Sequence, residues 1–391
     1  MNIKPKIRKK QKINAIYFFL FGFLYYIISP VISLYFFDES WFVLIAKQHV
    51  KLNDYGLVYS FISVLCLLIF SLAYIIFSNL KFLKTNIGEK EKEHKLLPSI
   101  IFIIILSLLL FTIIKSYHSG VILFSGYNEG YNISLLGPLA TISFSSIIFM
   151  FYFEKKKYKI GFFIIYLISN IFLLGMGSRM FFLIGLISIA INEYHKNPQI
   201  IKTLKFYILS ISLFLFILFI GIWRSNSEFS LEKLLGIFFA EPLFTSISAI
   251  NYLNTIENES LIKIPWDVVA SILNFIPSEI FKDKIVIISQ IAYDIKSYSP
   301  FGASSLLTNI YINFGILFPI YVFSIGMLFG ILSKLSYNKL IYSIYIATLP
   351  LLMFHFFREG FITYIKIQFF NGLIFPIFII LLISLLLRVK R

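Results

Sequence analysis

The fold is decided by stretches such as LPSIIFIIILSLLLFTII at residues 97–114, which contains no charged side chain. A helix of that length is about 27 Å long, close to the ~30 Å hydrocarbon core of a bilayer. Nine further apolar stretches lie at residues 14–37, 56–79, 132–153, 160–174, 180–192, 206–223, 303–332, 340–357 and 368–387. The sequence therefore predicts an all-α polytopic integral membrane protein with about ten transmembrane helices.

Basic residues fall on alternate connections between these stretches. If the N-terminus is cytoplasmic, 23 of the 35 lysines and arginines lie on inner connections, although the outer loops are longer in total. The positive-inside rule then places both termini in the cytoplasm. The formal net charge of +16 thus reflects the basic residues on the predicted cytoplasmic connections. It does not indicate nucleic acid binding, because the chain has no basic domain with interleaved aromatic residues.

Composition leaves no room for a separate soluble domain. Hydrophobic residues make up 59% of the chain and charged residues 14%, so residues 1–391 are predicted to form a single transmembrane domain. The first apolar run follows a basic segment and lacks a small-residue cleavage pattern, which is typical of an uncleaved signal anchor. Cys66 is the only cysteine, which excludes an internal disulfide and a cysteine-based metal site. We expect no metal and no cofactor.

One long hydrophilic connection, residues 224–302, is predicted to be a periplasmic or extracellular loop. It contains two apolar stretches, Leu231–Leu253 and Trp266–Phe281, both of which are interrupted by charged residues. A charge at the centre of a bilayer is costly, so these stretches are predicted to form amphipathic interfacial or re-entrant helices.

The apolar run after Gly175-Met-Gly-Ser-Arg179 has only 13 residues, or roughly 20 Å of helix, too short to cross a bilayer. Either the bilayer thins locally, or this turn lies below the outer surface and lines a polar cavity, which we prefer. Arg224 and Arg358 also fall at outer span ends. Guanidinium groups suit phosphate oxygens, so the three arginines are predicted to converge on a diphosphate. The alternative is that Arg179 only reaches the outer headgroups.

Four pieces of the chain resemble the O-antigen polymerase (Wzy) family, the oligosaccharide repeat unit polymerases. They are the Gly-Ser-Arg turn in Gly177 to Phe182, Arg224 at the start of the long loop, the stretch Gly302 to Gly330, and Arg358-Glu359-Gly360 before the last span. The third piece contains Leu306, Tyr311, Asn313, Phe314, Gly315 and Gly326.

The resemblance implies a membrane glycosyltransferase of the bacterial cytoplasmic (inner) membrane. Such an enzyme transfers a growing glycan from undecaprenyl diphosphate to a lipid-linked repeat unit, giving O-antigen or capsule-type polysaccharide. Expected partners are this lipid-linked oligosaccharide, membrane lipids, a chain-length regulator and a flippase. The expected catalytic residues are Arg179, Arg358 and Glu359, and the expected substrate-binding residues are Arg224, Glu241 and His355.

The general base is expected to be Glu359, with Glu241 and then His355 as the next candidates. A structural salt bridge with Arg358 is the alternative role for Glu359. Three other functions stay open. A GT-C-like polyprenyl-phosphate-sugar glycosyltransferase would use the acidic pair Asp38 and Glu39, which could also hold a divalent ion. An O-antigen ligase or a lipid-linked oligosaccharide flippase would share the lipid substrate. The sequence does not determine the sugars, their linkage or the anomeric outcome.

Overall fold

The computed structural model describes residues 13–49, 57–80, 94–124, 133–224, 230–254, 261–277 and 280–389. Within these ranges every regular element is helical. The first half contains α1 (Ala15–Phe23), η1 (Leu24–Ile28), α2 (Ser29–Phe36), α3 (Trp41–His49), α4 (Leu57–Asn79), α5 (Leu97–His118), α6 (Ile133–Tyr152), α7 (Lys156–Gly175), α8 (Met180–Lys196), η3 (Pro198–Lys202) and α9 (Leu204–Arg224).

The second half begins with the helices of the long loop and returns to the bundle. Its elements are α10 (Leu231–Leu253), α11 (Trp266–Leu273), α12 (Lys284–Ile291), η5 (Lys296–Tyr298), α13 (Leu306–Phe314), η6 (Gly315–Leu317), α14 (Phe318–Leu335), α15 (Lys339–Thr348), η7 (Leu349–Leu352), α16 (His355–Arg358), α17 (Phe361–Ile365), η8 (Lys366–Ile374) and α18 (Phe375–Val389).

Seven helical segments within the described ranges are long and apolar enough to cross a membrane. They are Ala15–Phe36, Tyr59–Asn79, Leu97–His118, Leu135–Tyr152, Lys156–Gly175, Leu306–Leu335 and Phe361–Leu387. Each overlaps a stretch that the sequence predicts to be a span, so the protein is helical and membrane-embedded. The other three predicted spans correspond to the shorter helix α8 and to the shorter apolar segments Leu204–Phe216 and Lys339–Leu352. For these three, crossing stays a prediction.

Two of the predicted span boundaries were wrong. The predicted span 340–357 is not one continuous helix, because the chain turns at residues 353–354 between η7 and α16. The predicted last span, 368–387, begins earlier, at Phe361, and therefore takes Lys366 into the helix. The inner basic residues in 1–12 and 81–93 lie outside the described residues.

The long α4 and α14 pack along each other for most of their length, and close backbone contact explains why. Gly326 and Gly330 are four residues apart on α14. A Cβ on Gly326 would lie 2.6 Å from the Phe70 carbonyl oxygen, and one on Gly330 would lie 2.9 Å from the Tyr74 carbonyl oxygen. Small residues at this spacing let membrane helices approach closely where no hydrophobic driving force exists between them.

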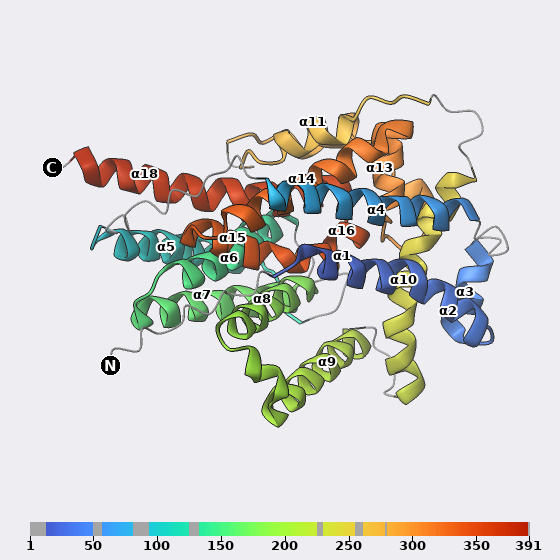
Figure 1. The fold of residues 1–391 in the computed structure, drawn as a ribbon, viewed down its shortest axis with the longest axis horizontal. Coiled ribbons are helices and arrows are strands. Elements are labelled where there is room, and N and C mark those ends of the chain that lie inside the picture. Colours follow the sequence, from blue (N-terminus) through green and yellow to red (C-terminus); the bar gives the residue numbers. More distant parts are fainter. Residues whose placement is uncertain are drawn as a thin grey trace, which may run out of the picture.

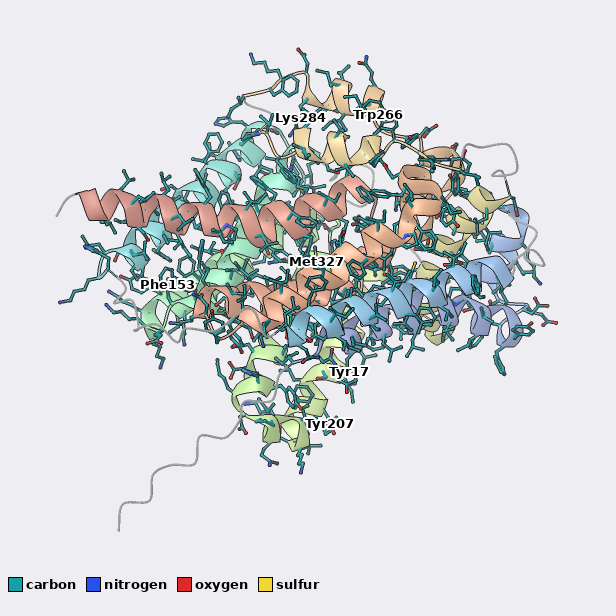
Figure 2. The ribbon with its side chains drawn as sticks, turned by 45° about the horizontal axis from the view of Figure 1, so that its top comes forward. Tyr17, Phe153, Tyr207, Trp266, Lys284 and Met327 are labelled. Carbon is teal, nitrogen blue, oxygen red and sulfur yellow. The ribbon has the colours of Figure 1, made fainter. Side chains whose placement is uncertain are left out.

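Helix α10 of the long loop lies across one end of the bundle, and α11 lies along its side (Figure 1). Figure 1 shows α10 running across the horizontal helices near α2 and α3, at the end opposite the C-terminus. Neither α10 nor α11 is among the seven candidate spans, in keeping with helices that do not cross the membrane. By contrast, α9 stands apart from the bundle in both views, with Tyr207 labelled on it in Figure 2. Most of its described side chains are exposed.

Candidate functional site

A cavity of about 610 Å³ lies where α5, α6, the α7–α8 turn, the loop after α11 and the segment from α16 to η8 meet. Five basic side chains line it: Arg179, Arg358, Lys115, Lys284 and Lys366. Among the described lining residues, Glu359 is the acidic one. The described lining side chains are therefore predominantly basic, and they also include the polar side chains of Thr112, Thr141, Ser178, Asn274, Ser304, Thr363 and Asn371.

The α7–α8 turn brings Arg179 to the cavity wall. Gly177 ends α7 with a φ of 88°, a backbone conformation that side chains other than glycine disfavour. Its N–H donates to the Leu174 carbonyl at 2.8 Å, and the Ser178 N–H donates to the Leu173 carbonyl at 2.7 Å. This pair of bonds is a Schellman motif, which reverses the chain and leaves Arg179 as the N-cap of α8. The turn lines a cavity, as the sequence predicts.

Arg358 reaches the same cavity from the other half of the chain. It is the last residue of the one-turn helix α16, which is followed by extended backbone at Glu359. The Asn309 side chain on α13 donates to the Glu359 carbonyl at 3.2 Å. This bond fixes the backbone between Arg358 and α17, and so the position of the guanidinium.

Glu241, in the middle of α10, joins the two arginines. Arg179 Nη2 lies 2.8 Å from one carboxylate oxygen and Arg358 Nε lies 3.1 Å from the other. The Glu241 side chain is 16% exposed. Burial acts to raise the pKa of this carboxyl, but Arg358, Arg179 and the Tyr26 hydroxyl outweigh it, and the pKa lies below its ordinary value of 4.5. Glu241 therefore stays ionised at neutral pH and is a poor proton acceptor.

The first span contributes two tyrosines to this cluster. Tyr26 donates to Glu241 at 3.4 Å, and Tyr25 donates to the Phe238 carbonyl at 2.9 Å. Phe238 needs such a donor, because Pro242, four residues later in α10, has no N–H. Both tyrosines belong to the π-helical segment η1, and π-helical turns inside α-helices are frequent at functional sites.

Glu359 and His355 complete the set of described candidates. Glu359 lies 3.7 Å from Arg358 Nη1 and lines the cavity, so its carboxylate is held less tightly than that of Glu241. His355 also lines the cavity and packs against the Phe181 ring. It is buried, and its Nδ1 atom has no hydrogen-bond partner among the described residues.

The structure does not bring every predicted residue to the cavity. The side chain of Arg224 lies outside the described residues. Its neighbour one turn earlier, Gly221, does face the site, because a Cβ there would lie 2.5 Å from Arg179 Nη1. The acidic pair Asp38 and Glu39 is exposed and does not line the cavity, and Asp38 forms an ion pair with Lys47.

Comparison of the chain with protein-family models, curated proteins and solved structures finds no match. The resemblance to the O-antigen polymerases therefore rests on the quoted residues alone.

Sequence reasoning missed Tyr26, Lys284 and Lys366. Lys366 carries a signal that could have been read, since it is a lone lysine in the apolar run FITYIKIQFF of residues 361–370. An ionisable residue inside a span marks a candidate site by default. Tyr26 and Lys284 carry no comparable local signal, because their roles depend on helices far away in sequence.

Proposed function

We propose that this protein is a membrane glycosyltransferase that polymerises undecaprenyl-diphosphate-linked oligosaccharide repeat units on the outer face of the bacterial cytoplasmic membrane. The observation that carries the proposal is the pair Arg179 and Arg358, held on one cavity wall by the shared carboxylate of Glu241. The cavity is large enough for a drug-sized ligand, and its described lining contains more basic than acidic side chains. Such a site favours a ligand with several negative charges.

The chemistry follows from these positions. An acceptor sugar hydroxyl attacks the anomeric carbon of the glycan, the new C–O bond forms, and the bond to the diphosphate oxygen breaks with its electron pair. Arg179 and Arg358 stabilise the charge that develops on the departing diphosphate, an effect that is strong where water is excluded. Glu359 takes the hydroxyl proton, because it lines the cavity and is bound less tightly than Glu241. Glu241 positions both guanidinium groups and takes no part in proton transfer.

The test is to delete the gene in its native host and to compare surface polysaccharide on a gel after complementation. We expect the deletion strain to carry glycan with a single repeat, and wild type to restore the ladder. Arg179→Lys and Arg358→Lys should fail to restore it although they insert normally, because an ammonium group cannot make the bidentate contact.

Arg388→Lys is the matched control on the predicted inner side and should restore the ladder, as should the double variant Asp38→Ala, Glu39→Ala. Full activity in either Arg179→Lys or Arg358→Lys would refute the role of the arginine pair. Complete loss of glycan in the deletion strain would indicate a ligase or flippase, and a shortened repeat unit would indicate a sugar-adding transferase.

A further inference from the structure

The cavity carries basic side chains beyond the arginine pair. Lys366 Nζ donates to the Asn274 side-chain oxygen at 3.4 Å, and Lys284 Nζ donates to the Ile276 carbonyl at 2.8 Å. Both ammonium groups therefore meet at the short segment 274–276 after α11. Lys366 comes from the membrane part of the protein, whereas Lys284 comes from the α11–α12 lobe, on which Figure 2 labels Lys284 and Trp266.

Lys366 lies further along the segment that begins at α17 than Arg358 does. It follows Gly360, at the start of α17, by six residues, which is about 9 Å along a helix axis. It therefore lies inside the candidate span Phe361–Leu387. Gly137 on α6 leaves room for its ammonium group, because a Cβ there would be 3.2 Å from Nζ.

Holding two ammonium groups together in a buried place costs free energy. Lys284 is 5% exposed, and the two lysines repel each other. Because both ammonium groups reach the same short segment, an anion with more than one charge can bind to the two of them at once.

The same cavity also has apolar, exposed side chains in its lining. Its lining includes the exposed apolar side chains of Leu108 and Phe111 on the span α5, together with those of Ile276 and Ile285 on the α11–α12 lobe. Exposed apolar side chains on a span face hydrocarbon. The cavity thus combines basic groups with exposed apolar side chains, which fits an amphiphile with an anionic head and an apolar chain.

We propose that Lys284, Lys366 and Asn274 form a second anion subsite, which takes the diphosphate of a polyprenyl lipid that enters sideways from the membrane. The inference rests on the proposed function, because a polymerase must hold two lipid-linked substrates at once. The arginine pair holds the diphosphate that leaves, and the lysine subsite holds the diphosphate of the other substrate. Lys115 on α5 lines the same cavity and adds to its positive potential.

The experiment measures binding of radiolabelled undecaprenyl diphosphate to the full chain in phosphatidylcholine nanodiscs. We expect about two lipids per wild-type chain. Lys284→Gln and Lys366→Gln should each weaken one of the two sites roughly tenfold or more, as loss of a charge-assisted hydrogen bond does. Lys282→Gln is the matched control, because Lys282 is exposed, lies two residues away and does not line the cavity. It should bind like wild type.

Lys284→Arg keeps the charge and should retain both sites, which separates loss of charge from loss of fold. Unchanged binding in Lys284→Gln and Lys366→Gln would overturn the inference. So would equal competition by phosphatidylglycerol, which would make this a general anionic-lipid site, or by inorganic diphosphate, which has no tail.

The two proposals fail in different assays. Unchanged binding in the lysine variants refutes the second subsite and leaves the glycan ladder test untouched. A deletion strain without single-repeat glycan refutes the polymerase and leaves the binding result standing.

Discussion

Replacing Glu241 by Gln should destabilise the protein strongly, whereas replacing Glu359 by Gln should not. Each guanidinium of the Glu241 cluster is roughly 4 Å from the carboxylate, charge centre to charge centre, which gives about 4 kcal/mol per pair at an effective dielectric constant of 20. Desolvation and repulsion between the two arginines offset much of this sum. Removing one partner of a buried ion pair costs about 3–5 kcal/mol, and we expect that loss for Glu241→Gln.

Glu359 differs in geometry, so its expected contribution is smaller. It makes one contact to Arg358 at 3.7 Å, and both side chains are 27% exposed. Such pairs contribute about 0–1 kcal/mol. The assay is thermal unfolding of the purified proteins in one detergent, followed by tryptophan fluorescence. Glu241→Gln should unfold several degrees below wild type, and Glu359→Gln should unfold near wild type but fail to restore the glycan ladder.

The pH dependence gives a second readout for the same variant. The pKa of Glu241 lies below 4.5, so its stabilising effect is present above about pH 4.5 and is lost as the pH falls through the lowered folded-state value. The difference between wild type and Glu241→Gln should therefore close in acid. A Glu241→Gln protein that unfolds at the wild-type temperature at neutral pH would refute the reasoning, as would a larger loss in Glu359→Gln.

Two further predictions test the supports of the site. Gly177→Ala should lower the free energy of unfolding by about 1–2 kcal/mol, because alanine is strained at a φ of 88°. It should also shorten the polymer, because a displaced α7–α8 turn moves Arg179. A normal glycan ladder together with a wild-type melting temperature would contradict this. Asn313→Leu should weaken the attachment of α11 to α13. The Asn313 side chain donates to the Asp267 carboxylate at 2.7 Å and accepts from the Asp267 N–H at 3.0 Å. Leaving this buried carboxylate without that donor costs about 1–3 kcal/mol of stability. Limited proteolysis should therefore cut faster within residues 261–277 of the variant. Protease resistance equal to that of wild type would argue against this role of Asn313.

Much of the architecture could be read from the chain, because crossing a membrane is a local property. Runs of apolar residues at 97–114 or 303–332 must pair their backbone groups internally in lipid, and a helix alone does so. The same reasoning set α10 apart from the spans, since Glu232, Lys233 and Glu241 interrupt its apolar run. It placed the start of the last span too late, at 368 instead of Phe361, because Lys366 interrupts the apolar run there.

The sequence by itself determined the helical, membrane-embedded class and singled out Arg179, Arg358 and Glu359. Only the tertiary structure decided that Glu241 binds both arginines and that Lys366 enters the cavity. The reason is that these contacts join residues far apart in the chain, such as Arg179 and Glu241, which are 62 positions apart. Hydrophobic periodicity fixes where each helix runs, but packing between helices decides which charged side chains meet.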